Sequence, residues 1–96
     1  MSQNAIFKFR LYVAGDTQNS SQALANLTSI CQAYLPLRHD IEIIDVFQEP
    51  KRGLADGIFM TPTLLKLSPF PARKIIGTLS QRQTLLQALG LETPAS

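Results

Sequence analysis

Apolar and polar residues alternate from Ile6 to Val13, which predicts a β-strand with one apolar face. The apolar face would carry Phe7, Phe9, Leu11 and Val13. The opposite face would carry Lys8, Arg10 and Tyr12. A second β-prone run, Ile41 to Phe47, is mostly apolar, so it predicts a strand that is buried on at least one face.

Between these two runs, apolar residues recur at helical spacing. Gly15 is free to adopt the positive φ of a turn before the helix, and Asn19 is expected to cap it in a capping box with Gln22. Pro36 should end the helix near Leu35. Its apolar stripe comprises Ala23, Leu24, Leu27, Ile30, Cys31 and Tyr34. Strand, helix and strand predict a βαβ unit with parallel strands and a right-handed crossover.

The segment from Glu49 to Ile58 shows weak periodicity and predicts a loop with at most a short helix. Thr61, Pro62 and Thr63 then open a third strand that runs to Leu67. Pro62 suits a first strand position because it has no N–H to donate. A Thr-Pro-Thr turn of this kind opens the third strand of thioredoxin-like folds, where the X-Pro bond is cis. A trans bond is the alternative, because only about 5% of X-Pro bonds in folded proteins are cis.

The last third of the chain predicts a hairpin followed by a helix. Residues 68–71 form a proline-rich turn, and Ala72 to Ile76 should pair with the third strand. Ser80 and Gln83 predict a second capping box, and Gly90 a helix end. The apolar side of this helix is Leu85, Leu86 and Leu89. The order βαβ then ββα predicts one thioredoxin-like α/β domain over residues 1–96, a mixed sheet with helices on its faces.

Composition narrows the classes of function. Of 96 residues, 45% are hydrophobic and 17% charged, which is typical of a soluble globular domain. A net charge of +2 is too small to argue for nucleic acid. We expect no membrane span or signal peptide, because no apolar run approaches about 18 residues and the N-terminus lacks the basic and apolar regions of a leader. One cysteine excludes an internal disulfide and fits a reducing cytoplasm.

Redox, metal and cofactor chemistry are not expected. A thioredoxin-type enzyme needs a Cys-X-X-Cys motif at the start of the first helix, where this chain has Gly15 to Asn19. Cys31 lies on the apolar stripe and is expected to be a buried structural thiol, with a redox role as the alternative. His39 has no metal-spaced neighbours, and there is no phosphate-cradling Gly-rich loop. No catalytic residue can be assigned.

Basic residues on the predicted hairpin are the remaining candidates for a binding role. If the third and fourth strands pair, Lys66 can approach Arg73 and Lys74. A solvated surface is the ordinary interpretation of such short charge groups. Among partners, an acidic protein surface is favoured, since complementary charge steers docking. Nucleic acid is disfavoured because no aromatic stacking platform accompanies the charge.

The chain resembles the KaiB family of circadian clock proteins. The resemblance rests on Leu11-Tyr12-Val13-Ala14-Gly15, on Thr61-Pro62-Thr63-Leu64, and on Arg73-Lys74-Ile75-Ile76-Gly77, and it extends without a gap from about Ile6 to Leu91. It implies a non-enzymatic protein that binds the ATPase KaiC, with KaiA and a sensor histidine kinase as further clock partners. Lys66 and Arg73 match basic residues that face KaiC in the family, and Lys74 matches the adjoining basic position.

The resemblance also implies two folds: a tetrameric ground state with a rearranged C-terminal half, and a thioredoxin-like monomer that binds KaiC. Self-association as a dimer or tetramer is therefore expected. The sequence departs from the family at Glu42 and Gly57, where lysines are frequent, and at Thr78 and Ala88. Ala88 and Gly90 mark the fold-switch region, where alanine favours continued helix. These departures leave a stress-response adaptor that does not bind KaiC as an alternative.

Overall fold

Four strands form one mixed sheet in the computed structural model, which describes residues 5–91. The sheet order is β2-β1-β3-β4. In chain order the elements are β1 (Phe7–Val13), α1 (Gln18–Tyr34), β2 (His39–Asp45), α2 (Pro50–Ala55), β3 (Thr63–Ser68), β4 (Arg73–Ile76) and α3 (Arg82–Leu89). The predicted βαβ and ββα halves are confirmed, and α2 is the short helix that the segment after Glu49 allowed.

Strand pairing follows the predicted topology. β1 and β2 are parallel, with Leu11 opposite Ile43, as the βαβ unit requires. β1 pairs antiparallel with β3, placing Leu11 opposite Leu64. β3 and β4 form the antiparallel hairpin, in which Lys66 is opposite Arg73. β2 and β4 are therefore the two edges of the sheet.

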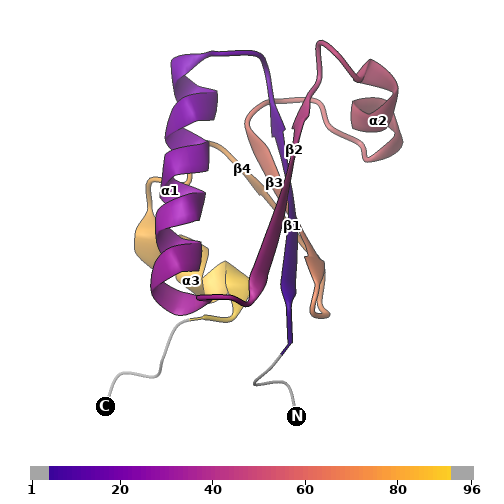
Figure 1. The fold of residues 1–96 in the computed structure, drawn as a ribbon. Coiled ribbons are helices and arrows are strands. Elements are labelled where there is room, and N and C mark those ends of the chain that lie inside the picture. Colours follow the sequence, from indigo (N-terminus) through magenta and orange to yellow (C-terminus); the bar gives the residue numbers. More distant parts are fainter. Residues whose placement is uncertain (1–4, 92–96) are drawn as a thin grey trace.

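Helices cover the two faces of the sheet unequally (Figure 1). α1 and α3 lie on one face, where the main core contains Phe9, Leu11, Leu27, Leu64 and Leu89. The short α2 lies on the other face, over a small cluster of Tyr12, Ile44 and Ile58. Tyr12 was expected on a polar face but is 0% exposed, because this second face is also covered.

Both predicted capping boxes are wrong. Thr17, not Asn19, precedes α1, and its Oγ1 accepts a hydrogen bond from the Ser20 amide at 3.3 Å. Gln81 precedes α3 without a side-chain cap, while the Ser80 hydroxyl lies 2.6 Å from Thr78 Oγ1. At α1 the geometry of the turn selects Thr17 as the cap, and at α3 no side chain caps the helix, which the spacing of residues in the sequence does not reveal.

β2 begins and ends two residues earlier than expected, and its burial is lower. It runs from His39 to Asp45, and only Ile44 within it is buried, because β2 is an edge strand. Asp45 Oδ1 accepts hydrogen bonds from the backbone N–H of Phe47 at 2.9 Å and of Gly15 at 3.2 Å. This local side-chain bonding competes with the strand ladder and turns the chain before Phe47.

Two glycines occupy the conformations predicted for them. Gly15 has a φ of +58° in the turn before α1, and Gly90 ends α3 in the left-handed conformation with a φ of +74°. Tyr34 departs from the predicted stripe, since it is 39% exposed at the end of α1, while Leu35 beyond it is buried. Over residues 5–91 no helix has the length and apolar character that crossing a bilayer requires.

Candidate partner-binding surface

The position of a thioredoxin-type redox centre carries no thiol. The turn before α1 contains Gly15 and Thr17, and the facing Thr61–Pro62 bond is cis. Cys31 lies in the core and is 0% exposed, and its burial raises the pKa of the thiol to about 11. A thiol with that pKa carries almost no thiolate near neutral pH, so it has little nucleophilic character.

The structure does not bring Lys66, Arg73 and Lys74 together as one patch. Lys66 and Arg73 are opposite each other in the hairpin and share the face that carries α1 and α3, while Lys74 is opposite Leu65 on the α2 face. Lys66 is only 4% exposed, so in this fold its side chain lies almost entirely beneath the surface. Strand register places it inward, since it is also opposite the core residue Phe9.

The contacts that hold the Lys66 ammonium in place are weak. Its Nζ lies 3.5 Å from the carbonyl oxygen of Leu89 and 5.5 Å from the centre of the Phe7 ring. Burial, followed by repulsion from Arg73, lowers the pKa of the Lys66 ammonium. Lys66 therefore supports the end of α3 rather than the outer surface.

Arg73 and Lys74 are exposed on the edge strand β4. The Lys74 Nζ donates to the carbonyl oxygen of Gly57 at 3.1 Å, which ties the hairpin to the loop after α2. Arg73 lies on the other face of the same strand. An edge strand with basic side chains on both faces offers charge and unpaired backbone groups to a partner.

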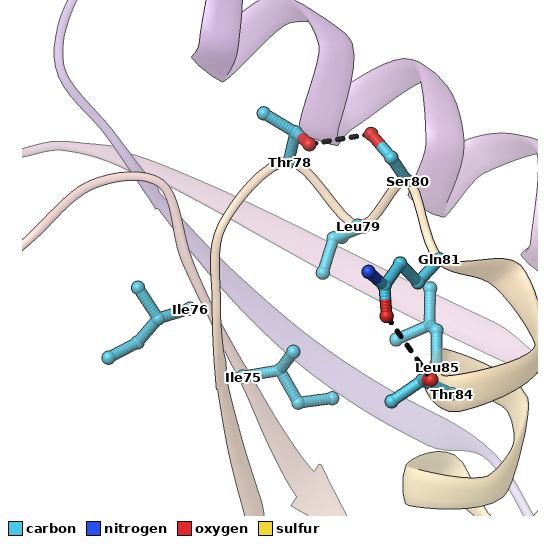
Figure 2. Close-up of a pocket in the computed structure, with 8 residues that line it drawn as sticks. All are labelled: Ile75, Ile76, Thr78, Leu79, Ser80, Gln81, Thr84 and Leu85. Atoms are coloured by element: carbon cyan, nitrogen blue, oxygen red, sulfur yellow. Dashed lines mark hydrogen bonds between the residues drawn. The ribbon is translucent and has the colours of Figure 1, made fainter.

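A groove of about 400 Å³ adjoins these residues (Figure 2). It lies between the end of β4 and the start of α3, with Ile75, Leu79 and Leu85 giving it apolar surface. Thr78 and Ser80 place hydroxyl groups at its border, joined to each other by a 2.6 Å hydrogen bond. The surface beside Arg73 and Lys74 thus combines exposed charge with a partly apolar hollow.

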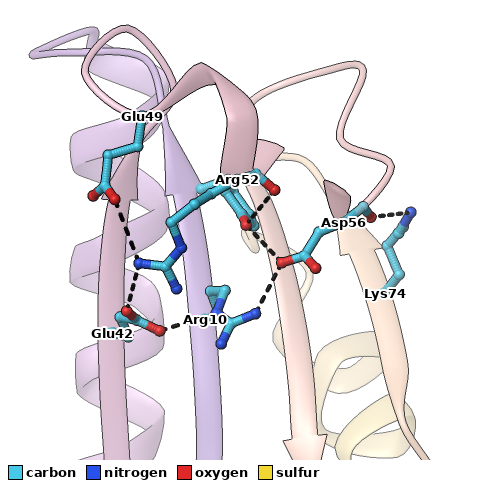
Figure 3. A network of polar contacts seen from close by, with 7 residues as sticks. Arg10, Glu42, Glu49, Arg52, Asp56 and Lys74 are labelled. Atoms are coloured by element: carbon cyan, nitrogen blue, oxygen red, sulfur yellow. Dashed lines mark hydrogen bonds and ion pairs between the residues drawn. The ribbon is translucent and has the colours of Figure 1, made fainter. Parts of the chain in front are cut away.

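A second set of charged residues, which the sequence did not reveal, joins α2 to the sheet (Figure 3). Arg10 Nε lies 2.9 Å from Glu42 Oε1, and Arg10 Nη1 lies 2.9 Å from Asp56 Oδ2. Arg52 Nη1 lies 2.9 Å from Glu42 Oε2. The Tyr12 hydroxyl donates to Asp56 Oδ2 at 2.6 Å. We call Arg10, Tyr12, Glu42, Arg52 and Asp56 the α2 network.

The α2 network shifts the acidity of its members. Burial, followed by the hydrogen bond to Asp56, raises the pKa of Tyr12 to about 12. The Tyr12 hydroxyl also lowers the pKa of Asp56, with Arg10 adding to the effect. Hydrogen bonds from Arg52 and then Arg10 lower the pKa of Glu42. These charges are mutually satisfied, which indicates an anchoring role rather than catalysis.

Part of this network carried a signal in the sequence. Arg10 and Glu42 lie on the same face of the neighbouring strands β1 and β2, where the parallel register places them opposite each other. Arg52 and Asp56 come from a helix whose placement no sequence pattern specified. No group of three His, Cys, Asp or Glu side chains able to hold a metal ion occurs in the described part of the chain.

The sequence matches the KaiB domain family over residues 10–91. The circadian clock protein KaiB3 of Synechocystis sp. is 42% identical over 92 residues, which span 96% of this chain and 87% of that protein. The circadian clock oscillator protein KaiB of Synechococcus elongatus is 41% identical over 91 residues, or 95% of this chain and 89% of that protein.

Solved structures show the same fold at low identity. The N-terminal domain of Synechococcus elongatus SasA matches with a TM-score of 0.73 at 18% identity, covering 100% of this chain and 94% of that one. Mitochondrial thioredoxin 3 of Saccharomyces cerevisiae matches with a TM-score of 0.70 at 18% identity, covering 92% of this chain and 80% of that one. The predicted thioredoxin-like fold is confirmed.

Proposed function

The chain belongs to the KaiB family, and from this premise we propose that it is a non-enzymatic regulatory protein of a circadian clock or a related signalling system. It docks on a KaiC-like ATPase ring and modulates the phosphorylation and output of that ring. The observation that carries the proposal is the family match over residues 10–91, together with 41–42% identity to named clock proteins over 91–92 residues. A KaiA-like protein and a sensor histidine kinase are the further partners, and the cytoplasm is the compartment.

The docking surface of this proposal is the edge strand β4 with its adjoining groove. Arg73 and Lys74 are exposed there, and the half-buried Ile75 and the exposed Ile76 supply apolar contact area. An acidic surface on the ring would be attracted by the two cations, and apolar contacts would then hold the complex. Lys66 contributes indirectly in this arrangement, by supporting the end of α3 from within.

A second part of the proposal concerns the state of the free protein. The structure has the thioredoxin-like arrangement, and the family resemblance implies a rearranged, tetrameric alternative. In proteins that switch fold, the free energies of the two packings of one sequence differ by only a few kcal/mol. We infer that both states are accessible to this chain and that Ala88 and Gly90, at the end of α3, lie in the segment that changes.

The docking role is tested by mixing the purified protein with the KaiC-like ATPase of its own organism. Complex mass is measured by size-exclusion chromatography with light scattering, in ATP and in ADP. A ring-sized complex with the wild-type chain, reduced at least about tenfold in affinity by R73E, is the expected result, because reversing a docking charge places like charges together. The matched control is K8E, which reverses an exposed lysine on β1, away from β4.

Three outcomes would count against this function. No complex in either nucleotide, with a folded protein, would reassign the chain to another partner, such as that of a stress-response adaptor. Equal binding by wild type and R73E would remove β4 from the interface. Equal losses in R73E and K8E would mean that only net charge matters.

A further inference from the structure

A second groove, of about 510 Å³, lies at the end of the sheet away from α2. Its lining residues come from the end of α1, the end of α3, the start of β1 and the β3–β4 hairpin. Its surface is slightly more apolar than polar, with Phe7, Leu35, Phe70 and Leu89 among the residues that line it. A volume of this size is in the range of small-molecule sites, which are generally about 300–1,000 Å³.

The groove contains two cations and no anion. Lys66 and Arg38 line it, and none of its lining residues within the described chain is acidic. Arg38 is half-buried, and its Nε lies 3.4 Å from the carbonyl oxygen of Ala5. The groove therefore carries positive charge. This charge lies beside apolar side chains, which weaken its screening by water.

Lys66 is the residue that points to a ligand. Its side chain is more than nine-tenths buried, and the only hydrogen bond that it makes among residues 5–91 is the 3.5 Å contact to Leu89. That distance exceeds the usual 2.7–3.2 Å of an N–H···O bond, and an ammonium group has three hydrogens to donate. The nearby Phe7 ring attracts the charge but accepts no full hydrogen bond.

The simplest structural role for Lys66 is to complement the carbonyl end of α3. That role accounts for one of its three donors, and no acidic side chain among the described residues lines the groove as a counter-ion. Burying an unpaired charge is unfavourable, and proteins generally pair such groups. A single negative charge arriving in the groove would supply the missing partner.

We propose that this groove binds a small amphipathic monocarboxylate, with its carboxylate on Lys66 and its apolar or aromatic body between the hairpin turn and the end of α3. A ligand with one negative charge matches the one buried ammonium, that of Lys66. A phosphate dianion would place a second negative charge against the apolar side chains of the groove. Arg38 adds attraction at the border of the groove. This inference is independent of docking to an ATPase ring.

The test is a titration of the ¹⁵N-labelled full chain with phenylacetate, followed by amide chemical shifts. We expect saturable shifts at Leu89, Gly90 and Phe70, which line the groove. The uncharged analogue 2-phenylethanol should bind about tenfold more weakly, since a hydrogen-bonded charge contributes that much or more. K66M should weaken phenylacetate binding by about tenfold and still fold, because it replaces a buried ammonium with an apolar side chain of similar length.

The matched control is K8M, which makes the same substitution at an exposed strand position outside the groove. It should bind phenylacetate as the wild type does. The proposal is overturned if no saturable shift occurs, if K66M binds like the wild type, or if the two phenyl compounds bind equally. It is also overturned if a blocked acidic peptide binds in a Lys66-dependent manner while phenylacetate does not, since the groove would then be a peptide-docking surface.

Discussion

Tyr12 and Asp56 form a short polar contact between the sheet and the segment that follows α2. The phenol oxygen lies 2.6 Å from Asp56 Oδ2, and 3.0 Å from the carbonyl oxygen of Arg52. A phenol has one proton to donate, and the shorter contact indicates that the carboxylate receives it. Because Tyr12 is fully buried beneath α2, water does not compete for this hydrogen bond.

Replacing Tyr12 with phenylalanine tests this contact. Y12F should reduce the free energy of unfolding by about 2 kcal/mol, because a hydrogen bond to a charged group contributes about 1.5–3 kcal/mol. Urea unfolding followed by circular dichroism measures the change. Y34F is the matched control, since Tyr34 is 39% exposed and surface substitutions usually change stability by less than about 0.5 kcal/mol.

The difference in stability between the wild type and Y12F is also expected to depend on pH. The pKa of Tyr12 is raised to about 12 in the folded chain, above the ordinary value of 10.0, so folding favours the protonated phenol. The resulting stability is fully present below pH 10 and is lost as the pH rises through about 12. The difference in stability between wild type and Y12F should therefore shrink between these pH values. A difference that stays constant to pH 12 would contradict the assignment.

At the scale of elements, α2 is a six-residue helix, too short to be stable by itself. It begins at Pro50, where a proline fits the first helical position, and its own Gly53 is buried beside Val46 and Ile58. The remaining attachment is the α2 network, in which Glu42 lies between Arg10 and Arg52. The position of α2 thus depends on charges from β1 and β2.

Reversing the charge at Glu42 should loosen α2 without unfolding the sheet. E42K places a third cation beside Arg10 and Arg52, so the amide hydrogens of Asp56 and Ile58, bonded within and after α2, should exchange several-fold faster. The effect should shrink at high salt, because these side chains are partly exposed. Hydrogen exchange followed by NMR measures both changes.

The control for E42K is D40K, which reverses another exposed carboxylate of β2 that makes no ion pair of 4.0 Å or less with the described residues. Exchange near α2 should remain unchanged in D40K. Equal acceleration in both variants would mean that net charge, not the α2 network, determines how firmly α2 is held.

At the scale of the whole molecule, the two halves contribute different surfaces. The βαβ half supplies α1 and most of the core, while the ββα half supplies the hairpin, α3 and the groove beside β4. The second groove is lined by residues of both halves. The exposed basic edge β4 lies in the half that the family resemblance marks as able to rearrange, whereas the groove containing Lys66 depends on both halves.

A substitution at Ala88 tests the proposed balance between the thioredoxin-like state and the rearranged state. A88G should destabilise α3 by about 1 kcal/mol, the usual difference between glycine and alanine inside a helix, and should increase the share of the self-associated, rearranged state. Light scattering reports the mass, and amide exchange in α3 should accelerate by about fivefold. A25G is the matched control, since Ala25 is an exposed position within α1. If A25G changes the mass as A88G does, general destabilisation explains the result.

Local patterns in the sequence determined the order of elements, the parallel and antiparallel pairings, the burial of Cys31 and the left-handed end of α3 at Gly90. Each of these follows from periodicity or from the conformational range of one residue, and such effects act over a few neighbouring positions. The predicted cap of α1 was wrong for the same reason: Thr17 and Asn19 can both cap a helix with a side-chain oxygen, and only the geometry of the turn selects Thr17.

Only the tertiary structure decided the surroundings of Lys66, Tyr12 and Asp56. An alternating strand shows which residues share a face, but it does not show which face a helix will cover. Lys66 is buried because strand register places it opposite Phe9 and beside the end of α3, and Tyr12 is buried because α2 covers the face on which it lies. Burial and charge pairing depend on contacts between residues far apart in the chain, and these contacts form only when the layers assemble.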